Sequence, residues 1–285
     1  MRLLVAIPHY WEPGGRADGR AHASTALDPS PRARALTRCL AALHSHYGPK
    51  QGILKLKDRL VGPANAAELF SLEILVLTDG SHHVLDRIEA DSGPYAHVPR
   101  NVPPLGLGFA CWDALRERVG GFDVYAYLED DLILADPLFF AKLAWFRRQV
   151  GPESLLLPNR FEVAGRGLMH KLYVDGDIAD TATARLQDRA YRPILRGEVM
   201  GRPVDFVRPS NPHSGCFFLD DGQLQSWIAR PDFHDRHPAF IGPLESAASL
   251  GVMRAFRVYK PAAENASFLE IEHAGTGFLS LLRRP

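Results

Sequence analysis

The segment Val124-Tyr-Ala-Tyr-Leu-Glu-Asp-Asp131 decides the fold of this chain, because an apolar, strand-forming run stops at three consecutive carboxylates. A run this rich in Val and Tyr is typical of a strand that is buried on both faces of a parallel sheet. In an open α/β sheet, ligands bind beyond the carboxyl ends of the strands. We therefore expect Glu129, Asp130 and Asp131 to lie at a ligand crevice.

Two interpretations of the three acids are open. Adjacent carboxylates repel one another, and a hard divalent cation bound by oxygen ligands, such as Mg²⁺ or Mn²⁺, would offset that repulsion. Alternatively, the acids form a polar turn before the next helix, since Asp136-Pro137 has the N-cap and first-position proline of a helix start. Spacing alone favours neither interpretation.

Strands and helices alternate through the first half of the chain. Residues 3–7 and 72–77 are aliphatic runs that end in Pro and in Thr-Asp-Gly-Ser, so they predict two further strands. Apolar residues at helical spacing predict amphipathic helices over 36–43, 109–119 and 139–150, the first of them opened by Ser30-Pro31. This alternation indicates an α/β fold: a Rossmann-like, mostly parallel sheet flanked by helices, in a single large domain.

The remaining segments are less regular. Residues 11–32 predict a loop that could fold over a ligand, and the basic residues 48–63 predict an insertion. Residues 163–203 have no clear period, and we interpret them as a substrate-facing region or lid. Later strands are expected over 214–219, 255–259 and 268–271, with helices over 224–228 and 244–251.

Composition narrows the class of protein. The chain has 285 residues, of which 46% are hydrophobic and 23% charged, as in an ordinary globular protein. Lys plus Arg and Asp plus Glu both total 33, so no net charge attracts nucleic acid, and a peripheral membrane contact is neither supported nor excluded. The first apolar run ends at Pro8, too short for a signal or a membrane span, which predicts a cytoplasmic protein. The cysteines are widely spaced and predict buried apolar residues, at Cys39, Cys111 and Cys216.

Three segments, in order along the chain, resemble those of GT-A glycosyltransferases, most similar to the family 2 type. Val5-Ala-Ile-Pro-His-Tyr10 resembles the opening strand and loop, and Glu73-Ile-Leu-Val-Leu-Thr-Asp-Gly-Ser81 resembles the second strand. Tyr127-Leu-Glu-Asp-Asp131 stands where the family has its Asp-x-Asp motif. The resemblance implies one continuous GT-A domain. Its nucleotide-sugar-binding half would be residues 1–135, and its acceptor-binding and catalytic half residues 136–285.

The resemblance also implies which residues hold the donor. Pro8 and Tyr10 belong to the loop that closes on the nucleotide, and Asp79 is expected to accept a hydrogen bond from a base imide such as that of uracil. His213, in the segment before a late strand, is expected to contact the donor sugar.

A metal site is implied next to the donor. By resemblance, Asp131 coordinates a divalent cation that bridges the diphosphate, and Glu129 or Asp130 reaches the ribose or the metal. His273 follows a late strand and is the implied partner of Asp131, since imidazole suits Mn²⁺ better than Mg²⁺. A bound cation would stabilise the negative charge that develops on the departing nucleoside diphosphate. A lone histidine such as His273 is equally explained by a structural role.

The segment Gly242-Pro-Leu-Glu-Ser246 stands where inverting members carry two acids at a helix N-terminus, and this chain has one. By resemblance, Glu245 is the general base that deprotonates the acceptor hydroxyl for attack at the anomeric carbon, with inversion. Glu245 is also explained as a first-turn acid that the helix dipole favours.

The function that follows first is a metal-dependent glycosyltransferase. It would move a hexosyl or N-acetylhexosaminyl group from a nucleotide diphosphate sugar, UDP-linked in the simplest case, to a hydroxyl of a glycan or glycoconjugate. The alternatives are a noncatalytic GT-A-like glycan-binding protein and a sugar nucleotidyltransferase, although the Gly-rich phosphate loop of the latter is missing. A metallohydrolase built from His9, His213, His273 and the acids lacks the spacing of known zinc motifs.

Overall fold

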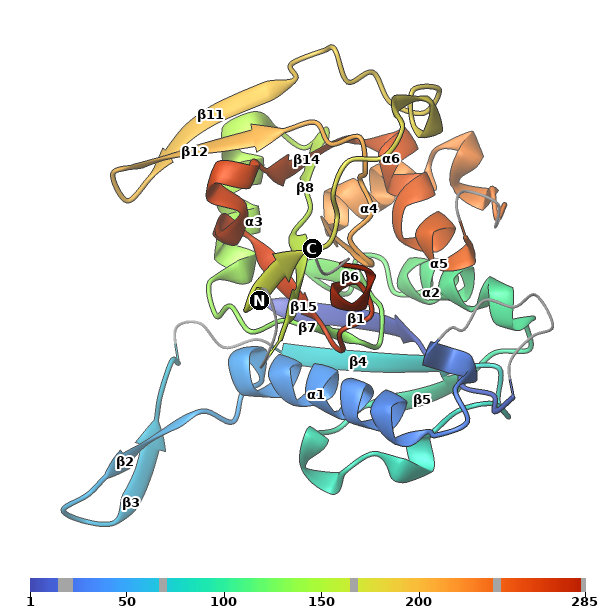
Figure 1. Cartoon of the computed structure of the whole chain (residues 1–285). Coiled ribbons are helices and arrows are strands. Elements are labelled where there is room, and N and C mark those ends of the chain that lie inside the picture. Colours follow the sequence, from blue (N-terminus) through green and yellow to red (C-terminus); the bar gives the residue numbers. More distant parts are fainter. Residues whose placement is uncertain (15–22, 67–70, 165–168, 238–241, 283–285) are drawn as a thin grey trace.

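A five-stranded sheet forms the centre of the protein (Figure 1). The computed structural model describes residues 1–14, 23–66, 71–164, 169–237 and 242–282. Four strands are parallel, and the edge strand β13 is antiparallel to β6. The expected α/β architecture, a mostly parallel sheet flanked by helices, is confirmed. In spatial order the strands are β13 (Cys216–Asp220), β6 (Val124–Leu128), β1 (Arg2–Pro8), β4 (Ser71–Thr78) and β5 (Ala96–Pro99).

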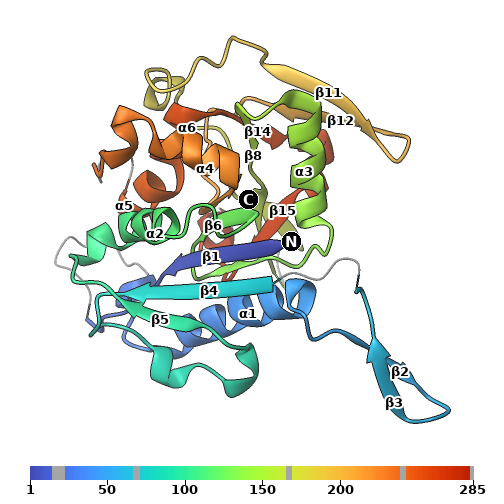
Figure 2. The ribbon, with the colours of Figure 1, turned by 180° about the vertical axis from the view of Figure 1, so that it is seen from behind.

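Both faces of this sheet are covered. Alternate residues of β1 belong to separate cores, with Leu3, Val5 and Ile7 packed on the side of α1 (Ser30–Tyr47) and Leu4 and Ala6 on the side of α2 (Leu107–Arg116). All five side chains are at most 1% exposed. Figures 1 and 2 show the two helices on opposite faces. A continuous aliphatic run is therefore stable in β1, because neither face meets water.

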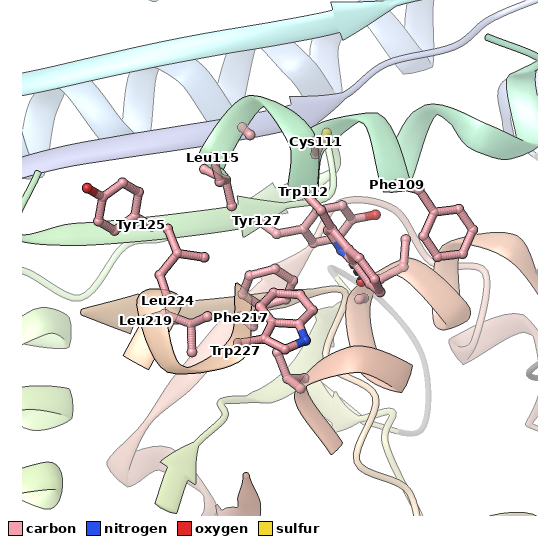
Figure 3. Packing of buried hydrophobic residues seen from close by; sticks show 14 of the residues in the cluster. Phe109, Cys111, Trp112, Leu115, Tyr125, Tyr127, Phe217, Leu219, Leu224 and Trp227 are labelled. Carbon is pink, nitrogen blue, oxygen red and sulfur yellow. Dashed lines mark hydrogen bonds between the residues drawn. The ribbon is translucent and has the colours of Figure 1, made fainter. Parts of the chain in front are cut away.

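Aromatic rings fill the core beneath α2 (Figure 3). Trp112 of α2 and Trp227 of α4 (Asp221–Ile228) pack edge to face, with ring centroids 4.7 Å apart. Tyr127 and Phe217 stack across the β6–β13 pair at 5.4 Å. Trp112 and Trp227 are each 1% exposed, so both are core residues.

Two smaller sheets follow the central one. β7 pairs with β15, which sets His273 opposite Leu132, directly after the three acids. One sheet contains β10 (Lys171–Tyr173), β9 (Asn159–Val163), β15 (Glu270–His273) and β7 (Leu132–Ile133). The other contains β11 (Ile194–Val199), β12 (Arg202–Val207), β14 (Arg257–Pro261) and β8 (Ser154–Leu156).

Several predicted boundaries are corrected. Helix α3 (Phe139–Val150) begins after Asp136-Pro137, because the Asp136 side chain accepts a hydrogen bond from the Leu138 amide at 2.9 Å and forms a turn there. Helix α1 has Pro29 at its N-cap instead of Ser30. Helix α2 ends at Arg116, so Val119 lies outside it.

Segments without a clear period contain short strands. β10 and β11 lie within residues 163–203, part of which (165–168) falls outside the described residues. The basic segment 48–63 forms the antiparallel hairpin β2 (Gly52–Lys55) and β3 (Leu60–Pro63), which projects from the body in both views (Figures 1 and 2). The expected loop over 11–32 includes residues 15–22, which are not described.

The last helix is continuous through α5 (Pro243–Glu245), a π-helical turn (Ser246–Leu250) and α6 (Gly251–Ala255). In the described parts of the chain, no helix is long and apolar enough to cross a membrane. Short 3-10 helices lie at Ala23–Thr25, Leu85–Arg87, Ala90–Ser92, Pro104–Gly106, Asp180–Ala182, Pro231–His234, Ala263–Phe268 and Leu279–Leu281.

Candidate functional site

The three acids lie at the carboxyl edge of the central sheet, as the sequence predicts. The parallel strands β1, β4 and β6 end there, and β13, which runs the opposite way, begins there. The Glu129 amide donates a hydrogen bond to the Gly215 carbonyl at 3.0 Å, which holds the start of the acidic turn against β13. The strand ends thus place residues from both halves of the chain around one site.

Asp130 is buried and bound by two side chains. Its Oδ1 lies 2.5 Å from Arg32 Nη2, and its Oδ2 lies 2.5 Å from His9 Nδ1. The expected contact of Asp130 with a ribose or a metal stays a prediction, and the structure shows instead an anchor that holds α1 to the acidic turn.

His9 has a defined tautomer. Its Nε2 accepts a hydrogen bond from the Val84 amide at 3.2 Å, so the proton of the neutral ring is on Nδ1 and is donated to Asp130. Burial lowers the pKa of His9, although its bond to Asp130 opposes that shift. The ring therefore acts as a neutral donor that orients the carboxylate.

Arg32 contacts two of the acids. Beyond its pair with Asp130, its Nη1 lies 3.3 Å from Asp131 Oδ2. Burial alone would lower the pKa of Arg32, but the carboxylates of Asp130 and Asp131 outweigh it and raise the pKa. A permanent cation is thus built into the acid cluster, which partly offsets the repulsion among the three carboxylates.

Asp131 and His273 lie next to one another, and their role as metal ligands stays a prediction. His273 Nε2 lies 3.7 Å from Asp131 Oδ2, and His273 Nδ1 lies 3.0 Å from Oε1 of the buried Glu162. The Glu162 carboxylate also accepts hydrogen bonds from the amides of Phe278 and Leu279. A carboxylate that fixes one imidazole nitrogen and leaves the other toward a ligand is the usual support of a metal-bound histidine.

The two side chains fit a cation whose remaining coordination positions are filled by the substrate and by water. Asp131 Oδ1 is buried and has no hydrogen-bond partner in the structure. Among the described residues, no group of three or more His, Cys, Asp or Glu is arranged to hold a metal ion. A protein pair of Asp131 and His273 would leave the other positions to phosphate oxygens and water, as is common for Mg²⁺ and for similar cations in nucleotide sites.

Glu129 is a buried acid with an unusual protonation state. Burial and the neighbouring charge of Asp131 raise the pKa of Glu129 to about 8, and the charge of Glu245 acts in the same direction. Its Oε1 has no hydrogen-bond partner and lies 4.0 Å from His213 Nε2. Glu129 therefore holds a proton at neutral pH and can donate it to a ligand.

His213 lies behind Glu129 and is buried. Its Nδ1 lies 3.1 Å from the Ser249 hydroxyl in the π-helical turn. Burial, and next the charge of Arg160, lower the pKa of His213 well below its usual value. The predicted contact of His213 with a donor sugar stays a prediction.

A buried network of opposite charges supports this side of the site. Asp175 accepts hydrogen bonds from Arg160 at 2.9 Å and from Lys260 at 2.9 Å, and Lys260 also donates to the His213 carbonyl at 2.5 Å. Burial opposes ionisation of Asp175, but Lys260 and Arg160 outweigh it and lower its pKa. The network joins β9, β14 and the segment before β13.

The residues expected at the nucleotide base lie at the ends of β1 and β4. Pro8 is the last residue of β1, and the Tyr10 hydroxyl donates a hydrogen bond to Glu12 at 2.5 Å. The Asp79 carboxylate accepts from the amides of Ser81 and His82 and pairs with His82 Nδ1 at 2.7 Å. These contacts shape the turn after β4, and the base-binding role of Asp79 stays a prediction.

Glu245 lies in the first turn of the last helix and is partly exposed. Its Oε2 is 2.5 Å from the position that a β-carbon on Gly242 would take, so only a glycine fits there without displacing the carboxylate. The four residues before Gly242 lie outside the described parts of the chain. The role of Glu245 as general base stays a prediction.

Sequence reasoning missed several residues of the site, namely Glu162, Arg160, Asp175, Lys260 and Ser249. The alternation in β9 would even mislead, because Phe161 and Val163 are its apolar residues, whereas the structure buries Arg160 and Glu162. Nothing local marks the others, because their importance comes from partners distant in sequence.

A cavity lies away from the acids. It has a volume of about 210 Å³ and is lined by the first residues of β6 and by apolar side chains of α3, β8 and β13, such as Phe146, Leu156 and Phe218. It therefore opens toward the amino edge of the sheet. Asp131 and His273 lie at the opposite edge.

Comparisons with known proteins give alignments of structure only. No family model matches the chain, and no curated protein matches it. Solved structures that align include TarS from S. aureus, at 11% identity over 97% of this chain and 37% of that chain, with a TM-score of 0.42. Another is glucosyl-3-phosphoglycerate synthase from Mycobacterium tuberculosis in complex with Mn²⁺, UDP-glucose and phosphoglyceric acid (17% identity, 90% and 68% coverage, TM-score 0.40).

A third is CMP:2-keto-3-deoxy-manno-octonic acid synthetase complexed with CTP, at 15% identity over 92% of this chain and 91% of that chain, with a TM-score of 0.39. The chain spans little more than a third of TarS. At these identities and TM-scores, the alignments assign no activity to the chain.

Proposed function

We propose that this protein is a GT-A-type glycosyltransferase that uses a nucleotide diphosphate sugar and a divalent cation. The observation that carries the proposal is the arrangement of Asp131 and His273, 3.7 Å apart, with the histidine fixed by Glu162. This pair lies at the carboxyl edge of a mostly parallel sheet, where nucleotides bind in open α/β folds.

Asp131 and His273 would hold the cation, which when bound would stabilise negative charge on the departing diphosphate. Arg32 would also stabilise negative charge on the diphosphate. Its guanidinium lies at the acid cluster and is fixed by Asp130, so it offers a preorganised positive charge to the phosphates. UDP is the nucleotide that we expect, by the resemblance of the turn at Asp79.

The remaining acids have separate tasks in this proposal. Burial and the charge of Asp131 raise the pKa of Glu129 to about 8 in the metal-free protein, and a protonated Glu129 would donate a hydrogen bond to the sugar or ribose. Glu245 is the acid that would accept the proton of the acceptor hydroxyl, which leads to an inverted product. The acceptor would be a glycan or glycoconjugate hydroxyl.

The first test is calorimetric binding of UDP, GDP, dTDP and CMP, each with and without Mn²⁺. We expect one nucleoside diphosphate to bind more tightly with Mn²⁺, and Asp131→Asn to remove that increment. Asp180→Asn is the matched control, since its side chain is 79% exposed and lies outside the site. Metal-independent binding that Asp131→Asn leaves unchanged would contradict the metal role.

A second measurement tests whether Glu162 supports His273 as a metal ligand. Mn²⁺ binding by electron paramagnetic resonance should weaken about 10–100-fold in Glu162→Gln, because an unsupported His273 is a poorer ligand. Nucleotide release with a panel of sugar acceptors then tests turnover, and Glu245→Gln should abolish it while binding persists. Binding without turnover in the wild-type protein would favour the noncatalytic glycan-binding alternative.

A further inference from the structure

The β2–β3 hairpin projects from the body of the protein (Figures 1 and 2). In the described structure, these two strands pair only with each other. Isolated two-stranded hairpins are marginally stable in water, so a surface that covers this one would stabilise it. Its large aliphatic residues are 56–79% exposed, at Ile53, Leu54, Leu56, Leu60 and Val61.

The apolar residues occupy both sides of the hairpin. In the antiparallel register Leu54 is opposite Val61, and Lys55 is opposite Leu60. Residues that are opposite one another share a side, and residues that are adjacent in a strand point to opposite sides. One flat protein surface could therefore cover only one of the two apolar sides, whereas a lipid interface surrounds an inserted tip.

The charge of the hairpin indicates a lipid surface instead of a protein surface as its partner. Residues 49–63 contain one acidic residue, Asp58, and four basic residues: Lys50, Lys55, Lys57 and Arg59. Lysine is depleted at protein–protein interfaces. Clustered lysines beside apolar side chains are instead typical of segments that lie in the headgroup region of anionic bilayers, where long basic side chains reach back to the phosphates.

A second apolar tip extends on the same side of the molecule. The turn of the β11–β12 hairpin contains Met200, which is 90% exposed, and Gly201. Figures 1 and 2 show both hairpins reaching out toward the side where β1 begins. Two tips on one side can touch one planar surface together.

We propose that the protein docks on an anionic lipid bilayer through the tips of these two hairpins, with Leu56 and Met200 inserted and Lys55 and Lys57 at the lipid phosphates. The catalytic acids lie at the opposite edge of the sheet. Docking in this way leaves the site facing away from the bilayer. The inference is independent of the proposed function.

Flotation with phosphatidylcholine vesicles, with and without phosphatidylglycerol, tests the inference. We expect binding only to the anionic vesicles and a decrease with added salt. Lys55→Gln/Lys57→Gln should weaken binding about 25-fold, roughly five-fold for each charge. Leu56→Asn/Met200→Asn should weaken it at least about ten-fold, through the loss of apolar burial.

Leu27→Asn is the matched control. Leu27 is 79% exposed, as Leu56 is, but it lies just before α1, at the other end of that helix from the hairpin. Its replacement should leave vesicle binding unchanged.

Three results would overturn the proposal: no preference for anionic vesicles, equal losses in the Leu27 and Leu56 variants, or hairpin variants that bind as wild type does. A dimer in sedimentation that Leu56→Asn/Met200→Asn dissociates, without vesicle binding, would show that the occupant is a second copy of the chain.

Discussion

At the scale of single residues, Glu129 has the most unusual environment in the site. It follows a buried strand, its Oε1 has no hydrogen-bond partner, and the acids beside it are held by Arg32, His9 and His273. Burial and the charge of Asp131 therefore raise its pKa to about 8 instead of leaving it near that of an exposed glutamate. A protonated Glu129 would give the site a hydrogen-bond donor beside the other two acids.

This protonation predicts a pH dependence of stability in metal-free buffer. The folded state keeps the Glu129 proton over a range in which the unfolded chain has lost it, so the free energy of unfolding falls as pH rises. Relative to Glu129→Gln, wild type should lose roughly 3 to 4 kcal/mol between about pH 5 and about pH 8. Urea unfolding of both proteins across this range measures the difference.

Glu198→Gln, an exposed acid on β11, is the control and should run parallel to wild type. The difference between wild type and Glu129→Gln also removes the contributions of His9 and His213, which both proteins share. A difference that does not change with pH would mean that Glu129 is ionised in the folded protein.

At the scale of elements, the last helix is held by close packing of its backbone on two tryptophans. Gly251 follows the π-helical turn, and a β-carbon there would lie 2.2 Å from Cζ2 of Trp227 and 2.8 Å from Cη2 of Trp112. Trp112 in turn donates a hydrogen bond to the Ala247 carbonyl at 2.9 Å. These contacts place Ser249 against His213 and Glu245 near Glu129.

Gly251→Ala should therefore destabilise the protein by about 1–3 kcal/mol, because buried rings cannot move aside without opening other contacts. The midpoint and slope of urea unfolding measure the loss. Gly176→Ala is the matched control: nothing lies within 4 Å of its added carbon, and we expect a change within about 0.5 kcal/mol. Equal effects in both variants would show that the helix adjusts to the added methyl group.

At the scale of the whole molecule, buried charges connect the second half of the chain to the site. Lys260 of β14 is 2% exposed and reaches Asp175 and the His213 carbonyl, while Arg160 of β9 reaches the same Asp175. Each ion was removed from water on folding, so the loss of one leaves its partner buried and less compensated.

Lys260→Met should destabilise the fold by about 3 kcal/mol. Lys171→Met is the surface counterpart, since Lys171 pairs with Glu270 at 2.5 Å but is 35% exposed, and its loss should change stability by no more than about 1 kcal/mol. Thermal and urea unfolding of both variants measure how much each of the two ion pairs contributes to stability. A Lys260→Met protein as stable as wild type would show that Arg160 alone compensates Asp175.

The sequence by itself determined the main strands and helices of the first half of the chain and the edge of the sheet at which the acids lie. Apolar runs in β1, β4 and β6 and helical spacing in α2 and α3 are local signals, because burial on two faces or on one face leaves a period that can be read along the chain. The acidic turn after β6 and the buried, unpaired cysteines followed from the same reasoning.

Only the tertiary structure decided which charged groups meet. His273 and Glu162 are 111 residues apart, and Asp175 and Lys260 are 85 apart, so no local pattern relates them. The pairing of β15 with β7 and β9 brings His273 to Asp131 and Glu162. The tertiary structure also decided the protonation of Glu129, because the pKa of a buried acid depends on the charges and the water around it in space.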